Sequence, residues 1–137
     1  MNITHEREVK DGIKDLHKVY LINKLRDFCY KESFDAGWHT DLNTGELKER
    51  NKGEMLALIH SEVSEMLEGE RKDLMDDKLP HRKMVEVEAA DVIIRVLDYC
   101  GRWNLDVGGA FVEKVEFNRN RSDFKKENRQ KEGGKKF

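Results

Sequence analysis

Hydrophobic residues along the chain recur mostly at steps of three and four, which is the spacing of one face of an α-helix. The pattern predicts four helices, over about residues 9–36, 52–71, 83–103 and 106–121. In the first of them the recurring side chains are Leu16, Tyr20, Ile22, Leu25, Phe28, Cys29 and Phe34. Asp106 is placed to cap the fourth helix, because its side chain can accept hydrogen bonds from the first free backbone amides. We therefore expect an all-α protein.

The connections between these helices are short and polar. Gly37 and Trp38 end the first helix, and the residue types at 43–45 are those of a turn. Beyond Arg121 the composition is that of a solvated, basic tail. Four helices with short connections favour a helical bundle. Because so charged a chain has little apolar area for a core, we expect dimerisation to complete it.

Composition narrows the possible functions. Charged residues are 39% of the 137 residues, against about 25% in a typical protein, and the single proline argues against a disordered Pro-rich chain. The net charge is −2, but residues 114–137 carry +5 and the preceding 113 residues carry −7. An acidic body with a basic tail suits an anionic ligand held through metal ions better than it suits DNA, so we do not expect a nucleic-acid partner.

The chain also lacks the sequence features of membrane and secreted proteins. No apolar run approaches the roughly 18–20 residues that span a bilayer, and the N-terminal residues are too polar for a signal peptide. Cys29 and Cys100 are isolated thiols without metal-ligand spacing, and we interpret both as small buried hydrophobic residues. These features predict a cytoplasmic protein with no membrane partner.

Two pairs of carboxylates are the most informative feature of the sequence. Glu62-x-x-Glu65 and Glu88-x-x-Asp91 lie in consecutive predicted helices, and residues three apart share one helical face. One such motif is more often a solvated face, but both pairs here have apolar neighbours. Antiparallel packing would gather the four carboxylates, and two unit charges 4 Å apart repel by roughly 4 kcal/mol. All-oxygen ligation is typical of Mg²⁺, with Mn²⁺ as a substitute, and such ions also bind substrate phosphates.

Other polar and aromatic residues extend this hypothesis. Lys114, Asn118 and Arg121 form one stripe on the fourth helix, which suits the oxygens of a polyphosphate but is, on its own, more often a solvent-facing side. Trp38 offers an indole that could stack on a base, worth about 1–3 kcal/mol, although a core or interface anchor is the more common role.

Three charged residues continue the two acidic stripes. Glu68 could be a fifth ligand, but we interpret it as pointing outward. Arg95 and Asp98 are interpreted either as an ion pair with each other or as groups that hold the metal ligands in place. No histidine has Glu three residues before it, so the Glu-x-x-His motifs of di-iron bundles are absent and redox iron is not expected.

Taken in order, these motifs resemble the MazG-like all-α nucleoside triphosphate pyrophosphohydrolases, and in particular their compact phage and cyanophage members. The resemblance covers roughly residues 22–137 and includes Gly37-Trp38 and the Glu-Gly-Gly-Lys run at 132–135. Residues 1–21 form an N-terminal extension without a counterpart, and residues 122–137 form the basic tail. One departure is Phe124, which stands where relatives often have His.

The chain length and the helix pattern predict a single domain over residues 1–137, folded as a four-helix bundle. The resemblance implies that this bundle forms a homodimer or homotetramer. It implies Mg²⁺ binding by Glu62, Glu65, Glu88 and Asp91, and phosphate binding by Lys114, Asn118 and Arg121. The reaction would cleave a nucleoside or deoxynucleoside triphosphate between the α and β phosphates, giving the monophosphate and pyrophosphate. We expect Glu65, beside Glu62, to orient or deprotonate the attacking water. The alternative is a module that binds or senses nucleotides, or an alarmone such as ppGpp, without hydrolysis.

Overall fold

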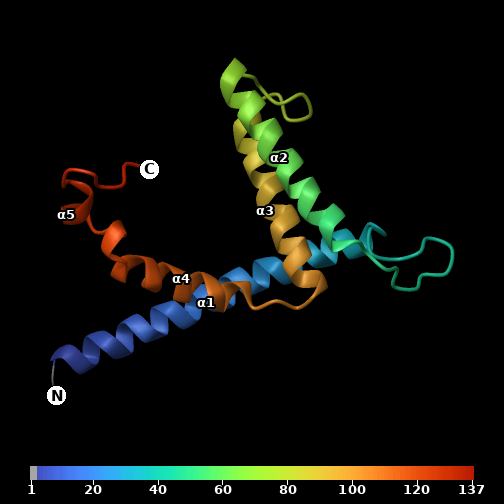
Figure 1. Ribbon diagram of the computed structural model, residues 1–137. Helices are drawn as coiled ribbons and strands as arrows, with labels where there is room; N and C mark the ends of the chain where they lie inside the picture. The colour runs from blue at the N-terminus through green and yellow to red at the C-terminus, as the bar shows by residue number, and fades with distance from the viewer. Residues whose placement is uncertain (1–2) are drawn as a thin grey trace. The chain divides into compact units, whose positions relative to one another are not determined.

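The computed structural model describes residues 3–137, and side chains from Asp15 onward. Its four long helices are α1 (Ile3–Asp35), α2 (Lys52–Lys72), α3 (Met84–Arg102) and α4 (Val107–Asn120), as Figure 1 shows. A 3-10 turn, η1 (Ser122–Phe124), and a one-turn helix, α5 (Lys126–Arg129), follow them. Residues 3–137 contain no β-strand, so the all-α prediction is confirmed. The stretch beyond Arg121, expected as a solvated tail, is largely exposed but contains these two short turns.

Side-chain caps explain where α2 and α4 begin. Asn51 Oδ1 accepts a hydrogen bond of 3.1 Å from the backbone amide of Glu54 at the start of α2. At the start of α4, Asp106 Oδ1 accepts one of 2.9 Å from the amide of Gly109, so the predicted cap is confirmed. Each bond satisfies an amide that has no partner within its helix.

The end of α1 is fixed by a glycine with positive φ. Gly37 has φ +82°, and its amide donates to the carbonyl of Phe34 at 2.9 Å while that of Trp38 donates to Ser33 at 3.0 Å. This pair of bonds is the Schellman arrangement, which favours glycine because a Cβ is strained there. A Cβ on Gly37 would also approach the side chain of Leu42 to 2.5 Å. The cap therefore sets the direction in which the chain leaves the helix.

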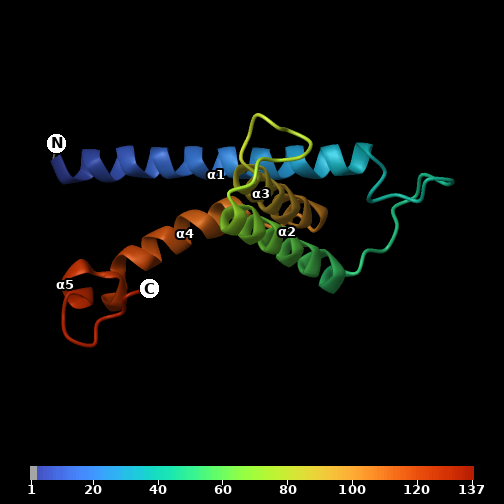
Figure 2. The ribbon, with the colours of Figure 1, turned by 90° about the horizontal axis from the view of Figure 1, so that it is seen from above.

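Two compact units can be distinguished, one formed by Lys24–Leu105 and the other by the chain up to Asn23 together with Asp106–Phe137. Within Lys24–Leu105, α2 and α3 lie side by side and antiparallel (Figure 1, Figure 2). The buried hydrophobic side chains of the described residues all belong to this unit: Cys29, Met55, Leu97 and Cys100. Both cysteines are free, as predicted, and burial raises the pKa of each thiol. The four-helix bundle stays a prediction.

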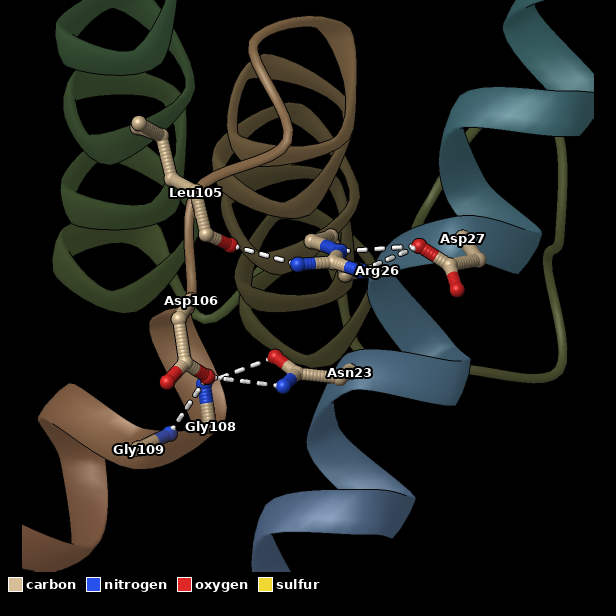
Figure 3. A network of polar contacts seen from close by, with 7 residues as sticks. All are labelled: Asn23, Arg26, Asp27, Leu105, Asp106, Gly108 and Gly109. Atoms are coloured by element: carbon tan, nitrogen blue, oxygen red, sulfur yellow. Dashed lines mark hydrogen bonds and ion pairs between the residues drawn. The ribbon is translucent and has the colours of Figure 1, made fainter.

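The C-terminal half of α1 packs against α3 within the same unit. A Cβ on Gly101 would lie 2.4 Å from the Cβ of Tyr30, so the two helices touch at a position that only glycine fits. Nearby, Arg26 Nη1 donates to the carbonyl of Leu105 at 2.7 Å, and the same guanidinium pairs with Asp27 (Figure 3). These contacts hold the end of α3 and the residues that follow it on α1.

A separate network holds the start of α4 in the other unit. Asn23 Nδ2 donates to Asp106 Oδ1 at 2.8 Å, and the amide of Gly108 donates to Asn23 Oδ1 at 2.9 Å (Figure 3). A Cβ on Gly108 would lie 2.5 Å from the carbonyl oxygen of Val19, so α1 and α4 also meet at a glycine. The Asn23 amide thus uses both its donor and its acceptor to join the two helices.

Large hydrophobic side chains remain exposed on the single chain. On α1 they include Leu25 and Phe28, and on the paired α2 and α3 they include Leu56, Val63, Leu67, Ile93 and Ile94. Large hydrophobic side chains exposed together are typical of interaction surfaces. The prediction that a second copy completes the core would account for it, and the dimer remains a prediction.

Candidate functional site

Three carboxylates from α2 and α3 lie close together. Glu62 and Glu65 on α2 and Glu88 on α3 each offer an oxygen, and these atoms lie within 4.8 Å of one another. Glu62 and Glu88 are each 7% exposed, whereas Glu65 is exposed to solvent. The antiparallel helix pair therefore assembles three of the four predicted ligands. Asp91, one turn beyond Glu88, does not belong to this three-residue group.

Negative charge accumulates around Glu88. Its burial, followed by the charges of Glu65, Asp91 and Glu62 and a hydrogen bond with Glu62, raises the pKa of Glu88 to about 7. Both burial and like charge disfavour the ionised form of a carboxyl group. Asp91 therefore acts on the cluster electrostatically although it stands outside the three-residue group.

A single arginine partly compensates this charge. Arg95 Nε donates to Glu62 Oε1 at 2.6 Å, from the α3 face that also carries Asp91. One guanidinium beside four carboxylates leaves an excess of negative charge. An all-carboxylate donor set of this kind could hold a hard divalent cation such as Mg²⁺ or Mn²⁺.

Arg95 and Asp98 do not pair with each other, so the ion-pair interpretation is wrong. Arg95 pairs with Glu62 instead, and Asp98 Oδ1 lies 2.7 Å from Nε2 of His39. Each side chain finds its partner on a different element, which spacing along one helix cannot reveal. Arg95 instead holds a carboxylate of the cluster in place, and the role of that carboxylate as a metal ligand stays a prediction.

His39 is a residue of this region that the sequence pattern does not single out. Its side chain is completely buried, and its ring centroid lies 5.0 Å from that of Tyr30. Nδ1 is buried without a hydrogen-bond partner among the described residues. Through Asp98, this histidine ties the loop after α1 to α3. In the sequence, His39 follows Gly37 by two residues. The helix cap at Gly37 directs the chain there, and this position is the one feature that could have indicated a buried role for the histidine.

A pocket of about 510 Å³ lies beside the carboxylates, within the range of about 300–1,000 Å³ typical of small-molecule sites. It is lined by Ser33, Trp38, Arg50, Glu54, Leu58, Asp91, Ile94, Arg95 and Asp98. Two of these residues connect it to the cluster, since Asp91 raises the pKa of Glu88 and Arg95 bonds to Glu62. Trp38 is 65% exposed, and its carbonyl accepts a hydrogen bond of 2.6 Å from Arg50 Nη1. Trp38 thus lies on a loop whose two ends are joined by this hydrogen bond, and its indole is accessible to a ligand.

The predicted phosphate-binding residues lie in the unit that contains α4. Asn118 and Arg121 line a second pocket, of about 320 Å³, together with Phe124, and Asn118 Oδ1 is buried there without a partner among the described residues. Lys114 does not line it; its ammonium lies 4.7 Å from the ring centroid of Phe117. The structure thus brings two of the three predicted residues together.

Arg121 is already engaged by a carboxylate. Its Nε and Nη2 donate to the two oxygens of Asp123 at 3.0 and 2.6 Å, and this pairing lowers the pKa of Asp123. Such a two-point contact has the geometry by which arginine also binds phosphate. The joint action of Arg121 and the α2–α3 carboxylates on one substrate stays a prediction.

Comparisons with protein-family models, with curated proteins and with solved structures found no match to this chain. No helix among the described residues is both long enough and apolar enough to cross a membrane.

Proposed function

We propose that the protein is a Mg²⁺-dependent, MazG-like nucleoside triphosphate pyrophosphohydrolase that converts a triphosphate to the monophosphate and pyrophosphate. The observation that carries the proposal is the gathering of Glu62, Glu65 and Glu88 within 4.8 Å, beside a pocket that presents an exposed indole. A carboxylate cluster suits metal-bound phosphates, and an indole suits a base. Both belong to the unit Lys24–Leu105.

The carboxylates of the cluster would have two roles at the reacting phosphate: binding the metal and accepting a proton. Glu62, Glu65 and Glu88 would hold the metal, with Asp91 adding charge nearby. When bound, Mg²⁺ would neutralise phosphate charge and lower the pKa of a bound water. Arg95 fixes the orientation of Glu62 through its 2.6 Å hydrogen bond.

Glu65 is the group we assign to the attacking water, because it is the exposed member of the cluster. It accepts a proton as the water oxygen bonds to the α-phosphorus. The bond from that phosphorus to the bridging oxygen breaks, and the electron pair leaves with pyrophosphate. Glu62 stands one turn before it on the same face of α2.

Two further groups of residues would bind the rest of the substrate. Trp38 stacks on the base, a contact worth about 1–3 kcal/mol. Lys114, Asn118 and Arg121 contact the phosphates, for which Arg121 exchanges the carboxylate of Asp123 for a phosphate of similar bidentate geometry. We also propose that a second copy of the chain covers the exposed apolar residues of α1, α2 and α3.

Product analysis tests the proposal. The protein is incubated with each common NTP and dNTP, with and without Mg²⁺, and the products are separated by ion-exchange chromatography. Monophosphate and pyrophosphate that form only with Mg²⁺ are expected. Diphosphate with inorganic phosphate, or unchanged nucleotide across the panel, would contradict it. Binding without turnover would favour the alternative, a nucleotide or ppGpp sensor.

A pair of variants ties the activity to the cluster. Glu65→Gln removes the proton acceptor but keeps the side-chain shape, and we expect it to lower kcat by at least about 100-fold, within the usual range for general-base catalysis. Glu68→Gln is the matched control, since Glu68 lies on the same helix and pairs with Lys72 instead. Similar kcat values for the two variants would remove Glu65 from the assigned role.

A further inference from the structure

We propose that Asp98 reads the edge of the bound base and selects bases with an exocyclic amino group, namely adenine, cytosine and guanine, over thymine and uracil. The inference rests on the proposed function, because it places the base in the pocket beside the carboxylate cluster. Asp98 lines that pocket together with Trp38, and both belong to the unit Lys24–Leu105. With the base stacked on Trp38, its edge is the part that meets the polar groups of the pocket wall.

Asp98 is held in one position by a buried partner. Its Oδ1 is bonded at 2.7 Å to Nε2 of the fully buried His39, and its side chain is 14% exposed. Because a carboxylate only accepts hydrogen bonds, Nε2 carries the proton in this contact. Oδ2 has no hydrogen-bond donor among the residues that the structure describes. A fixed acceptor is therefore left for a ligand.

The other charged residues that line the pocket interact with different groups or are exposed. Arg95 bonds to Glu62 and Arg50 bonds to the carbonyl of Trp38. Asp91 acts on Glu88, and Glu54 lies exposed in the first turn of α2. Among the acidic residues of the pocket, Asp98 is the one that is anchored by a buried side chain, that of His39. This anchoring gives its carboxylate the fixed position needed to recognise one hydrogen-bond donor of a ligand.

The chemistry of the base edges then gives the selection. A carboxylate accepts a hydrogen bond from an exocyclic amino group, as aspartate does from N4 of cytosine in the grooves of DNA. Thymine and uracil carry no such group, and their one ring N–H is flanked by two carbonyl oxygens that a carboxylate repels. Binding these bases would also leave Asp98 desolvated and unpaired, which is how polar sites reject ligands that lack a hydrogen-bonding group.

Nucleotide analogues test this without altering the protein. The kcat/KM of ATP is compared with that of purine riboside triphosphate, that of CTP with that of 2-pyrimidinone riboside triphosphate, and that of GTP with that of inosine triphosphate. Each analogue lacks only the amino group. We expect kcat/KM to fall at least about tenfold for the analogue of the preferred base. Equal values in all three pairs would overturn the assignment of Asp98 while leaving the pyrophosphohydrolase proposal intact. If no nucleotide is hydrolysed and none binds in calorimetric titrations with Mg²⁺, the proposed function fails as well.

A matched pair of variants assigns the selection to Asp98. Asp98→Asn keeps an oxygen for His39 but turns the free acceptor into a donor, so the tenfold preference for the amino-bearing nucleotide should be lost. Asp73→Asn makes the same exchange at the end of α2, where Asp73 pairs with Lys83 outside the pocket, and should keep the preference. An unchanged preference in D98N, or an equal loss in D73N, would overturn the proposal. If circular dichroism shows that D98N does not fold, the analogue pairs still decide it.

Discussion

Replacing Glu88 with Gln tests the electrostatics of the carboxylate cluster in the metal-free protein. Burial and the neighbouring carboxylates raise the pKa of Glu88 from its usual 4.5 to about 7. The folded protein therefore holds this proton more tightly than the unfolded chain does. The free energy of unfolding falls as the pH rises from about 4.5 to about 7, and the loss persists above that range. Each pKa unit corresponds to 1.36 kcal/mol, so ionised Glu88 costs the fold up to about 3 kcal/mol.

Glu88→Gln abolishes this cost, because the amide does not ionise and can still donate a hydrogen bond to Glu62. At pH 8 in EDTA we expect the variant to be up to about 3 kcal/mol more stable than the native chain. At pH 5 the gain should fall below about 1 kcal/mol. Urea unfolding followed by circular dichroism at both pH values measures the difference. Added Mg²⁺ should then stabilise the native chain more than the variant, since binding to the folded state raises its stability.

The control for this experiment is Glu86→Gln on the same helix. Glu86 is exposed, and its Oε2 lies 3.8 Å from Nη1 of Arg82. A surface ion pair of this kind contributes at most about 1 kcal/mol to stability. Its replacement should change stability little and equally at both pH values. The reasoning about Glu88 would be refuted if E88Q were no more stable than the native chain at pH 8, or if its gain at pH 5 were as large.

Three further changes test separate parts of the account. In urea unfolding, Gly37→Ala should destabilise the fold by more than Gly45→Ala. Both glycines have positive φ, but only a Cβ on Gly37 would meet another side chain, at 2.5 Å. Equal losses of stability would contradict this steric argument. Arg95→Met should cost about 1–3 kcal/mol, because it removes the cationic partner of the buried Glu62 carboxylate. A loss that Mg²⁺ fails to reduce would argue against a metal beside Glu62. Leu67 is 58% exposed, and we expect a second copy of the chain to cover it. Leu67→Glu should therefore reduce the mass measured by light scattering to that of the monomer, 16.1 kDa. An unchanged oligomer would place the interface elsewhere.

Local features of the fold were predictable because they depend on neighbours in the sequence. The spacing of apolar residues located four helices, and the short side chain of Asp106 located the start of α4. The i, i+3 spacing of Glu62 and Glu65 placed them on one face, and the short connection to α3 brought Glu88 to them. The beginning of α1, at Ile3 instead of about residue 9, was missed because the polar first turns carry no apolar periodicity.

Contacts between distant elements could not be predicted in the same way. Asp91 shares a helical face with Glu88, yet the register of α3 against α2 leaves it outside the three-residue group. Arg95 and Asp98 have the spacing of an ion pair on one helix, but buried partners from α2 and from the loop after α1 engage them first. The role of His39 depends on a separation of 59 residues from Asp98, which no local pattern encodes.

The central claim is that water attacks the α-phosphorus of a nucleoside triphosphate at the carboxylate cluster. The most direct measurement is hydrolysis of the preferred nucleotide in ¹⁸O-labelled water with Mg²⁺, followed by mass spectrometry of both products. We expect one ¹⁸O atom in the nucleoside monophosphate, none in pyrophosphate, and no turnover when Mg²⁺ is removed. Label in the pyrophosphate would place the attack at the β-phosphorus, and turnover in EDTA would separate the reaction from a metal held by Glu62, Glu65 and Glu88.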